Sequence, residues 1–355
     1  KKNKIVSKKT FWYLKDKDIK YSLKKTEKKL DNLFTRSIKK HLISDRRIGV
    51  FLSGGTDSTI ICNKINQIKN DPYDTFTYDF QSSKEFGEGI KAQKVSKLLG
   101  LKNHTSIVDS KYVTDNFDKL LNIIESPITS LRLFGVFKNY ETAKKNNYKV
   151  IIEGHGGDEQ FAGYEYNYIF HVIEKFKKSK NKIQLINDLF FSKYYKSMNP
   201  SKIEDILSTF LFQYGSTSDG VKFVDPNFLN KDFLDETVPD NYYQLNNFSK
   251  NLLKNSQKID THILKLPRVL KYTDRISMFH GIEARVPFLD HKLFEFSYNL
   301  KNEFKFNKNS SRWIFRKINK IKNLHLKNKK SIVDPQTFWL KKDLKEYFFS
   351  IIDSK

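Results

Sequence analysis

The sequence predicts an α/β protein with an open parallel sheet, helices on both faces of the sheet, and a mainly helical C-terminal part. Three observations support this prediction. Strand and helix patterns alternate between residues 46 and about 165, which is typical of parallel sheets. Two glycine-rich turns follow short apolar runs within this region. From residue 166 onward the strand patterns fade, and long helical patterns rich in Phe and Lys dominate.

The individual elements follow from the spacing of the apolar residues. Residues 1–45 predict a basic strap and one helix, with apolar positions at Leu23, Leu30, Leu33 and Phe34. Buried strands are predicted at residues 47–52, 75–80, 103–108 and 150–152. Helices are predicted around Ile61, Ile65 and Ile68, around Ala92, Val95 and Leu99, and over residues 136–145. We therefore expect a strap and helix in 1–45, an α/β core in 46–175, and a mainly helical substrate or support region in 176–355.

The first glycine-rich turn lies between a predicted strand and a predicted helix, where residues 51–58 read FLSGGTDS. Amide groups at a helix N-terminus lack internal partners and carry partial positive charge, so small residues let an anion approach them. The turn therefore indicates a phosphate site, although an ordinary strand-to-helix turn explains the same residues equally well. It is not a Walker A loop, because no Gly-Lys-Ser/Thr follows, and the third glycine of the dinucleotide fingerprint is missing.

A second glycine-rich turn, EGHGGDEQFAGY at residues 153–164, follows the strand predicted at 150–152. Ligands of open α/β sheets bind outside the carboxyl ends of the strands, so both turns should face one crevice. Asp57 and Asp158 could then share a magnesium ion, which prefers carboxylate oxygens together with substrate phosphates. Either acidic turn by itself is more often a helix cap than a metal site. Their placement at the ends of two strands favours metal and phosphate.

A third cluster of charged residues lies among apolar residues at 272–296 and contains Arg275, Glu283, Arg285, Asp290 and His291. Buried charges need partners. We therefore expect an internal ion-pair network around Glu283 and Arg285, which would support the wall of the site.

Composition limits the class of protein. The chain has 355 residues, a net charge of +25 and one cysteine, Cys62, which excludes a disulfide framework and a cysteine-based zinc site. No apolar run approaches the ~18 residues of a membrane span. Lysine is spread almost evenly, so we expect a solvated basic surface and no specific nucleic-acid binding. Because no signal peptide is visible, we expect a cytoplasmic protein, and because the chain begins at Lys1 we expect part of a longer one.

Three motifs together resemble a known family. SGGTDS (residues 53–58) resembles the loop SGGxDS of the PP-loop ATP pyrophosphatases, which have an adenine nucleotide α-hydrolase-like fold. The ordered set of SGGTDS, EGHGGDEQFAGY and DRISMFHGIEARVPFLDHKL resembles the synthetase domain of glutamine-dependent asparagine synthetases. FWYL near the start resembles the strap after their glutaminase domain. The likeness covers nearly the whole chain, and its third motif is highly specific to this group.

The resemblance implies a site for ATP and Mg²⁺. The β- and γ-phosphates of ATP would be held by Ser53, Gly54, Gly55, Thr56, Asp57 and Ser58, and the adenosine by Leu52, Tyr78, Glu153 and Gly154. Asp57 and Asp158 match the magnesium-binding aspartates. A late lysine that contacts the phosphates matches Lys329 in KKSIVDPQTFWL, with Lys330 as its rival, because Ser331-Ile332 replace the family's Gly-Phe.

The resemblance also implies an amide-forming ligase. A substrate carboxylate would attack the α-phosphorus of ATP, and ammonia would then convert the acyl-adenylate to an amide and AMP. In the family, ammonia comes from glutamine that an N-terminal cysteine hydrolyses. Cys62 is not at such a position, so we expect a glutaminase domain or subunit, or solution, to supply the ammonia.

One departure from the family bears on the substrate. Asparagine synthetases usually show Ser-Gly-Glu-Gly where this chain has Glu153-Gly154-His155-Gly156, and their glutamate contributes to aspartyl-adenylate formation. His155 is therefore a candidate catalytic residue, as a general base or as a donor to the substrate. Because an imidazole cannot act as a fixed carboxylate, two substrates stay open at near parity. One is aspartate, and the other is a carboxylate on a larger molecule, such as a sugar acid of a surface polysaccharide.

Two further function classes are weaker alternatives. A tRNA-modifying PP-loop enzyme would use the basic surface, but such sulfur-transfer enzymes usually carry additional catalytic cysteines. A binding module that has lost catalysis is disfavoured, because Ser53, Asp57 and Asp158 are all present.

Overall fold

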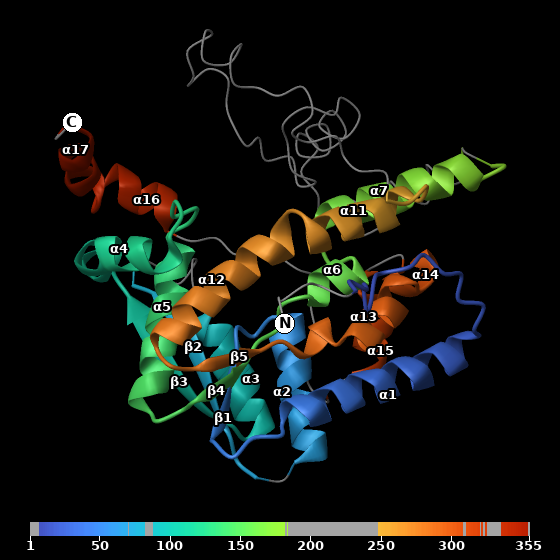
Figure 1. Ribbon diagram of the computed structural model, residues 1–355, viewed down its shortest axis with the longest axis horizontal. Coiled ribbons are helices and arrows are strands. Elements are labelled where there is room, and N and C mark those ends of the chain that lie inside the picture. The colour runs from blue at the N-terminus through green and yellow to red at the C-terminus, as the bar shows by residue number, and fades with distance from the viewer. Residues whose placement is uncertain are drawn as a thin grey trace, which may run out of the picture.

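The computed structural model describes residues 7–69, 71–81, 88–181, 183, 248–307, 310–319, 321, 324 and 335–353. Its centre is a five-stranded sheet in the order β3-β2-β1-β4-β5 (Figure 1). All four neighbouring pairs are parallel. The strands are β1 (Ile48–Phe51), β2 (Asp74–Phe80), β3 (Lys102–Val108), β4 (Val150–Ile152) and β5 (Glu283–Arg285). The predicted fold class is confirmed, and the four predicted strands lie within one residue of their predicted bounds.

The order of the strands reverses at the centre of the sheet. The chain runs from β1 outward to β2 and β3, and then returns to place β4 on the other side of β1. Such a reversal opens a crevice at the carboxyl ends of the two central strands. Both glycine-rich turns follow these strands, since they come directly after β1 and β4.

Helices cover both faces of the sheet and form two separate cores. On one face lie α1 (Leu23–His41), α2 (Thr56–Ile68) and α3 (Gly89–Leu99), whose apolar side chains share a cluster with Val50 and Ile152. On the other lie α4 (Ser110–Ile124), α5 (Arg132–Lys145) and α12 (Lys265–Phe279), clustered with Phe76 and Ile151. Adjacent residues of β4 thus point to opposite cores, as the pleat of a strand requires.

The described part of the chain after β4 is mainly helical, and the predicted helical C-terminal part is confirmed (Figure 1). Its elements include α6 (Gly157–Phe161), α7 (Glu165–Lys178), α11 (Leu252–His262), η3 (Pro287–Leu289), α13 (His291–Tyr298), α14 (Asn302–Lys305), β6 (Phe306–Asn307), β7 (Ser310–Ser311), α15 (Trp313–Ile318), α16 (Gln336–Lys341) and α17 (Lys345–Asp353). In the part of the chain that the structure describes, no helix combines the length and apolar character needed to cross a membrane.

Strand β5 was not expected from the sequence, and the ion-pair prediction for its residues needs correction. Arg285 Nε does lie 2.9 Å from Glu283 Oε1, but the Glu283 side chain is 60% exposed, so this pair is at the surface and not internal. Arg285 also donates to the backbone carbonyls of His41 and Ile43, which ties β5 to the end of α1. The other charges of the cluster pair elsewhere, Arg275 with Glu125 and Asp290 with Lys40.

A buried imidazole on α7 makes stability depend on pH. His171 is 5% exposed and stacks on Phe306, and burial, followed by the charges of Lys175 and Lys305, lowers its pKa to about 3. The pKa of His171 in the folded protein lies below its unfolded value of about 6.5. The contribution of the neutral ring to the free energy of unfolding is therefore fully present above pH 6.5 and is lost as the pH falls toward 3. At pH 5 the loss is about 2 kcal/mol.

We expect His171→Phe to remove this part of the acid sensitivity while keeping the aromatic contact. Urea unfolding at pH 7.5 and pH 5 measures the free energy of unfolding of both proteins. The wild type should lose about 2 kcal/mol more than the variant between the two pH values. The exposed His262, replaced by Phe in the same way, controls for removing a histidine. Equal losses in wild type and His171→Phe would show that His171 is not the sensitive group.

Candidate active site

The two glycine-rich turns meet at the carboxyl ends of β1 and β4, and glycine is what permits the contact. A Cβ atom on Gly157 would lie 2.7 Å from Asp57 Cγ, closer than real Cβ contacts. One on Gly154 would lie 3.3 Å from Asp57 Cβ and 3.4 Å from the Ser58 amide nitrogen. The second turn therefore rests directly on the first, and the structure confirms the expected proximity of the two turns.

The first turn has the shape of an anion-binding loop. Its two serines hold it together, with Ser53 Oγ lying 3.1 Å from Ser58 Oγ and accepting from the Gly55 amide at 3.2 Å. Helix α2 starts at Thr56, and Gly55 at its N-cap supplies no side-chain cap. Backbone amides at such a helix start attract anions. The predicted phosphate-binding residues are thus gathered around one helix N-terminus.

Gly54 makes the turn possible because of its backbone conformation and its close neighbours. Its φ is +69°, and a Cβ atom would lie 2.7 Å from the backbone carbonyl carbon of Lys91. We expect Gly54→Ala to lower the free energy of unfolding by about 3 kcal/mol, from left-handed strain plus overpacking. Affinity for a nucleotide phosphate at this turn, probed with ATP, should fall at least about tenfold, since one decade corresponds to about 1.4 kcal/mol of binding.

Gly100 supplies the matched control for this change. It has a similar φ of +67° but open space around the built Cβ, so Gly100→Ala should cost only about 1 kcal/mol of strain and leave the affinity for ATP unchanged. Chemical denaturation and ATP-binding titrations check both expectations. Equal effects of the two substitutions would mean that the close contact at Gly54 has no role.

The carboxylates of Asp57 and Asp158 converge on one cation. Nη1 of Arg312 lies 2.8 Å from Asp57 Oδ2 and 3.0 Å from its Oδ1, and 2.7 Å from Asp158 Oδ1. The Arg312 side chain is 2% exposed. The carboxylates of Asp57 and Asp158 are thereby held at one place, where their oxygens are ligands of the kind that Mg²⁺ prefers.

These residues fit a Mg²⁺ ion bound together with a nucleotide. Mg²⁺ is usually held by one or two protein carboxylates, and substrate phosphates and water complete its octahedron. Asp57 and Asp158 supply two such groups beside the phosphate loop. No set of three or more His, Cys, Asp or Glu suited to a metal occurs among the described residues.

Arg312 was missed by the sequence analysis. It lies 255 positions from Asp57 and 154 from Asp158, and it belongs to none of the three motifs. Its backbone φ of +55° is unusual for a residue with a side chain, and such strain is often held where a site needs it. The only available signal was that an arginine among apolar residues needs carboxylate partners.

The second turn places Glu153 and His155 in direct contact. His155 Nε2 lies 2.7 Å from Glu153 Oε2, and the Glu153 side chain is 5% exposed while that of His155 is 35% exposed. The hydroxyl of Tyr140 on α5 donates to Glu153 Oε1, and burial, then the charge of Glu153, raises the pKa of Tyr140 well above its ordinary value. Thr273 Oγ1 on α12 lies 3.3 Å from His155 Nε2.

The remaining predicted residues lie in different settings. Leu52 is 1% exposed, and its amide donates to the Phe76 carbonyl, so its side chain belongs to the core. The ring of Tyr78 lies against Gly135 on α5, where a Cβ would be 2.3 Å away. Lys329 and Lys330 lie outside the described residues.

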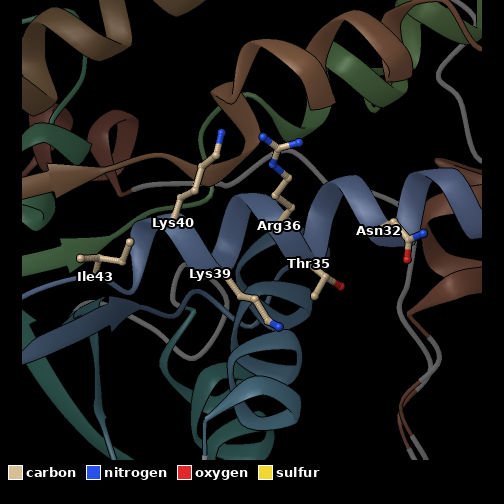
Figure 2. Close-up of a pocket in the computed structure, with 6 residues that line it drawn as sticks. All are labelled: Asn32, Thr35, Arg36, Lys39, Lys40 and Ile43. Atoms are coloured by element: carbon tan, nitrogen blue, oxygen red, sulfur yellow. The ribbon is translucent and has the colours of Figure 1, made fainter.

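A hollow of about 380 Å³ on the surface of α1 is lined by Asn32, Thr35, Arg36, Lys39, Lys40 and Ile43. In Figure 2, Lys40 and Arg36 point to one side of the helix, whereas Lys39 and Thr35 point to the other. It contains none of the predicted site residues. We therefore place the chemistry at the strand ends and not in this hollow.

A glycine-rich anion loop, two convergent carboxylates and a parallel sheet define an α/β protein of the nucleotide-binding type. The chain belongs to the asparagine synthase family, whose model, "Asparagine synthase", matches residues 29–355. It is 24% identical over 357 residues to "Asparagine synthetase [glutamine-hydrolyzing] 1" of Bacillus subtilis (strain 168), covering 97% of this chain and 55% of that protein. It is 25% identical over 297 residues to the asparagine synthetase of Mus musculus, covering 81% of this chain and 38% of that protein.

The chain thus spans only about half, or less, of the length of these relatives. Among solved structures, the NMN synthetase of Francisella tularensis matches 59% of this chain and all of its own, at 15% identity and a TM-score of 0.28.

Proposed function

We propose that this chain is an ATP-dependent ligase that adenylates a carboxylate and transfers ammonia to it, giving an amide, AMP and pyrophosphate. The observation that carries the proposal is that the carboxylates of Asp57 and Asp158 meet at the guanidinium of Arg312, beside the first glycine-rich turn. Membership of the asparagine synthase family supports it. We also propose that the chain is divided into a strap and helix (1–45), an ATP-binding α/β core (46–175) and a substrate or support region (176–355). A cytoplasmic location is part of the same proposal.

The residues of the two turns would carry the first step. The loop from Ser53 to Ser58 would hold the β- and γ-phosphates, and Asp57 and Asp158 would hold a Mg²⁺ ion, which would supply positive charge to stabilise the departing pyrophosphate. An oxygen of the substrate carboxylate bonds to the α-phosphorus as the bond to the bridging oxygen breaks. Lys329, or its neighbour Lys330, would add a positive charge to the phosphates, as the family resemblance implies.

The second step transfers nitrogen to the activated acid. The lone pair of ammonia attacks the acyl carbon, a proton leaves the nitrogen, and the C–O bond to AMP breaks to give the amide. Ammonia would come from a glutaminase domain or subunit. Aspartate is one candidate acid, and a sugar acid of a surface polysaccharide is the other, because His155 stands where the family has a carboxylate.

Carboxylate-dependent exchange of ³²P between pyrophosphate and ATP tests the proposal directly. Aspartate, glutamate and uronic acids are screened separately, each with Mg²⁺ and without added ammonia. We expect exchange with one class of acid and none without acid. Absence of exchange with every acid, combined with tight, sequence-selective tRNA binding at physiological salt, would favour the tRNA-modifying alternative instead.

A further inference from the structure

We propose that Glu153 is a positioning residue that holds His155 as the proton acceptor of the amide-forming step, and not a contact of the adenosine. This inference rests on the proposed function and assigns a role within the same site. It concerns two residues of the second glycine-rich turn, Glu153 and His155.

Both oxygens of the Glu153 carboxylate are engaged by protein groups. Oε2 faces His155 Nε2 at 2.7 Å, and Oε1 accepts from the Tyr140 hydroxyl. The backbone amide of Glu153 donates to the Arg285 carbonyl at 2.8 Å, as a continuation of the β4–β5 pairing. With its side chain only 5% exposed, the carboxylate is fixed at both ends and turned toward the imidazole.

This arrangement sets the tautomer of His155. When Nε2–H donates to Glu153, the lone pair of the neutral ring lies on Nδ1. A buried negative charge in contact with the ring also favours its protonated form, so the imidazole becomes a better proton acceptor. A base that is oriented by a third group is the usual arrangement of proton transfer in active sites.

Among the described residues, groups near the ring come from several elements. Glu153 faces it from the end of β4, with the Tyr140 hydroxyl of α5 behind, and Thr273 approaches from α12. The turn that carries His155 touches Asp57 through Gly154 and Gly157. The ring is therefore fixed relative to the phosphate loop, where the adenylate would form.

Ammonia adds to the acyl carbon of the adenylate through its lone pair, and the carbonyl π pair moves to oxygen. One N–H proton passes from the resulting ammonium nitrogen to Nδ1 of His155. The carbonyl re-forms as the C–O bond to AMP breaks, so AMP leaves with that electron pair and the imidazolium stays paired with Glu153.

Glu153→Gln is the central test, because it removes the charge and keeps the shape. We expect kcat for amide formation to fall 10- to 100-fold, while the KM for ATP and the rate of ATP–pyrophosphate exchange stay within twofold. Tyr140→Phe removes only the donor to the far oxygen and should give a smaller loss of kcat. Glu153→Asp keeps the charge and should recover part of the activity lost in Glu153→Gln.

A second readout requires no turnover. In protein with ¹⁵N-labelled histidine, the ring signals of His155, assigned by their absence in His155→Gln, are followed through a pH titration. We expect Glu153→Gln to move the midpoint of His155 to lower pH by one unit or more. If no acid supports ATP–pyrophosphate exchange, the proposed function fails. The titration then still tests whether Glu153 contacts His155, because it needs no turnover.

Two results would overturn the inference. A raised KM for ATP with unchanged kcat in Glu153→Gln would assign Glu153 to the adenosine. An unchanged midpoint of His155, with only a loss of thermal stability, would show that the carboxylate has a structural role.

Discussion

Asp57→Asn and Asp158→Asn should each lower ATP–pyrophosphate exchange at least about a thousandfold while the protein stays folded. Either change leaves the pyrophosphate charge with one carboxylate fewer to hold Mg²⁺, and metal stabilisation of such a transition state is worth several kcal/mol. A thousandfold loss corresponds to about 4 kcal/mol. Exchange assays over a range of Mg²⁺ concentrations measure the effect.

The fold should survive because Arg312 keeps one partner in either variant. In the wild type it contacts both carboxylates, so either variant keeps one of these two ion pairs. Asp109→Asn is the control, since Asp109 caps α4 through the Tyr112 amide at 2.7 Å and asparagine caps helices as well as aspartate does. Near-normal exchange in Asp57→Asn or Asp158→Asn would exclude the shared metal site.

The parts of the fold that could be predicted are those encoded by local patterns. The runs at residues 48–51 and 150–152 are apolar and short, and each is followed by a glycine-rich turn. Strand identity, turn position and the parallel order of the sheet then follow from a few adjacent residues. The meeting of the two turns was predictable for the same reason, because the ends of neighbouring parallel strands lie at one edge of a sheet.

The parts that could not be predicted depend on contacts between distant residues. Strand β5 consists of Glu283, Ala284 and Arg285, which carry no apolar run, and it exists because β4 offers an unpaired edge. Arg312 reaches Asp57 across 255 positions. Neither contact leaves a periodic trace in the sequence.

The Glu153–His155 contact is a different case. Both residues were singled out, but their roles were assigned separately, one to adenosine and one to catalysis. Residues two apart in a strand point to the same side, yet the turn after β4 is not a strand, so the sequence did not predict that the two side chains meet. Because the two side chains are in contact, the effect of substituting one of them depends on the residue present at the other position.

His155→Glu should therefore damage this protein, although it restores the glutamate that is usual in the family. The new carboxylate would lie close to Glu153, whose Oε2 is 2.7 Å from the present imidazole. Two like charges about 4 Å apart repel by about 4 kcal/mol at an effective dielectric constant near 20. We expect a lower melting temperature and at least about a hundredfold loss of adenylation, equivalent to about 2.7 kcal/mol, with every acid tested.

The double variant Glu153→Ser with His155→Glu rebuilds Ser-Gly-Glu-Gly and separates repulsion from substrate choice. Removing the buried carboxylate should restore the melting temperature, and the double-mutant cycle should show a coupling of about 2 kcal/mol or more, as contacting residues do.

If aspartate is the native substrate, its exchange should return to the wild-type level or exceed it. If the native acid is another anion, its exchange should stay low, because the restored carboxylate lies beside it without the imidazole. We expect the second result, since the paired exchange of acid and imidazole changes the charge presented to the substrate. A double variant as unstable as His155→Glu alone would show that the two residues do not act as a unit, and the argument from His155 to the substrate would be wrong.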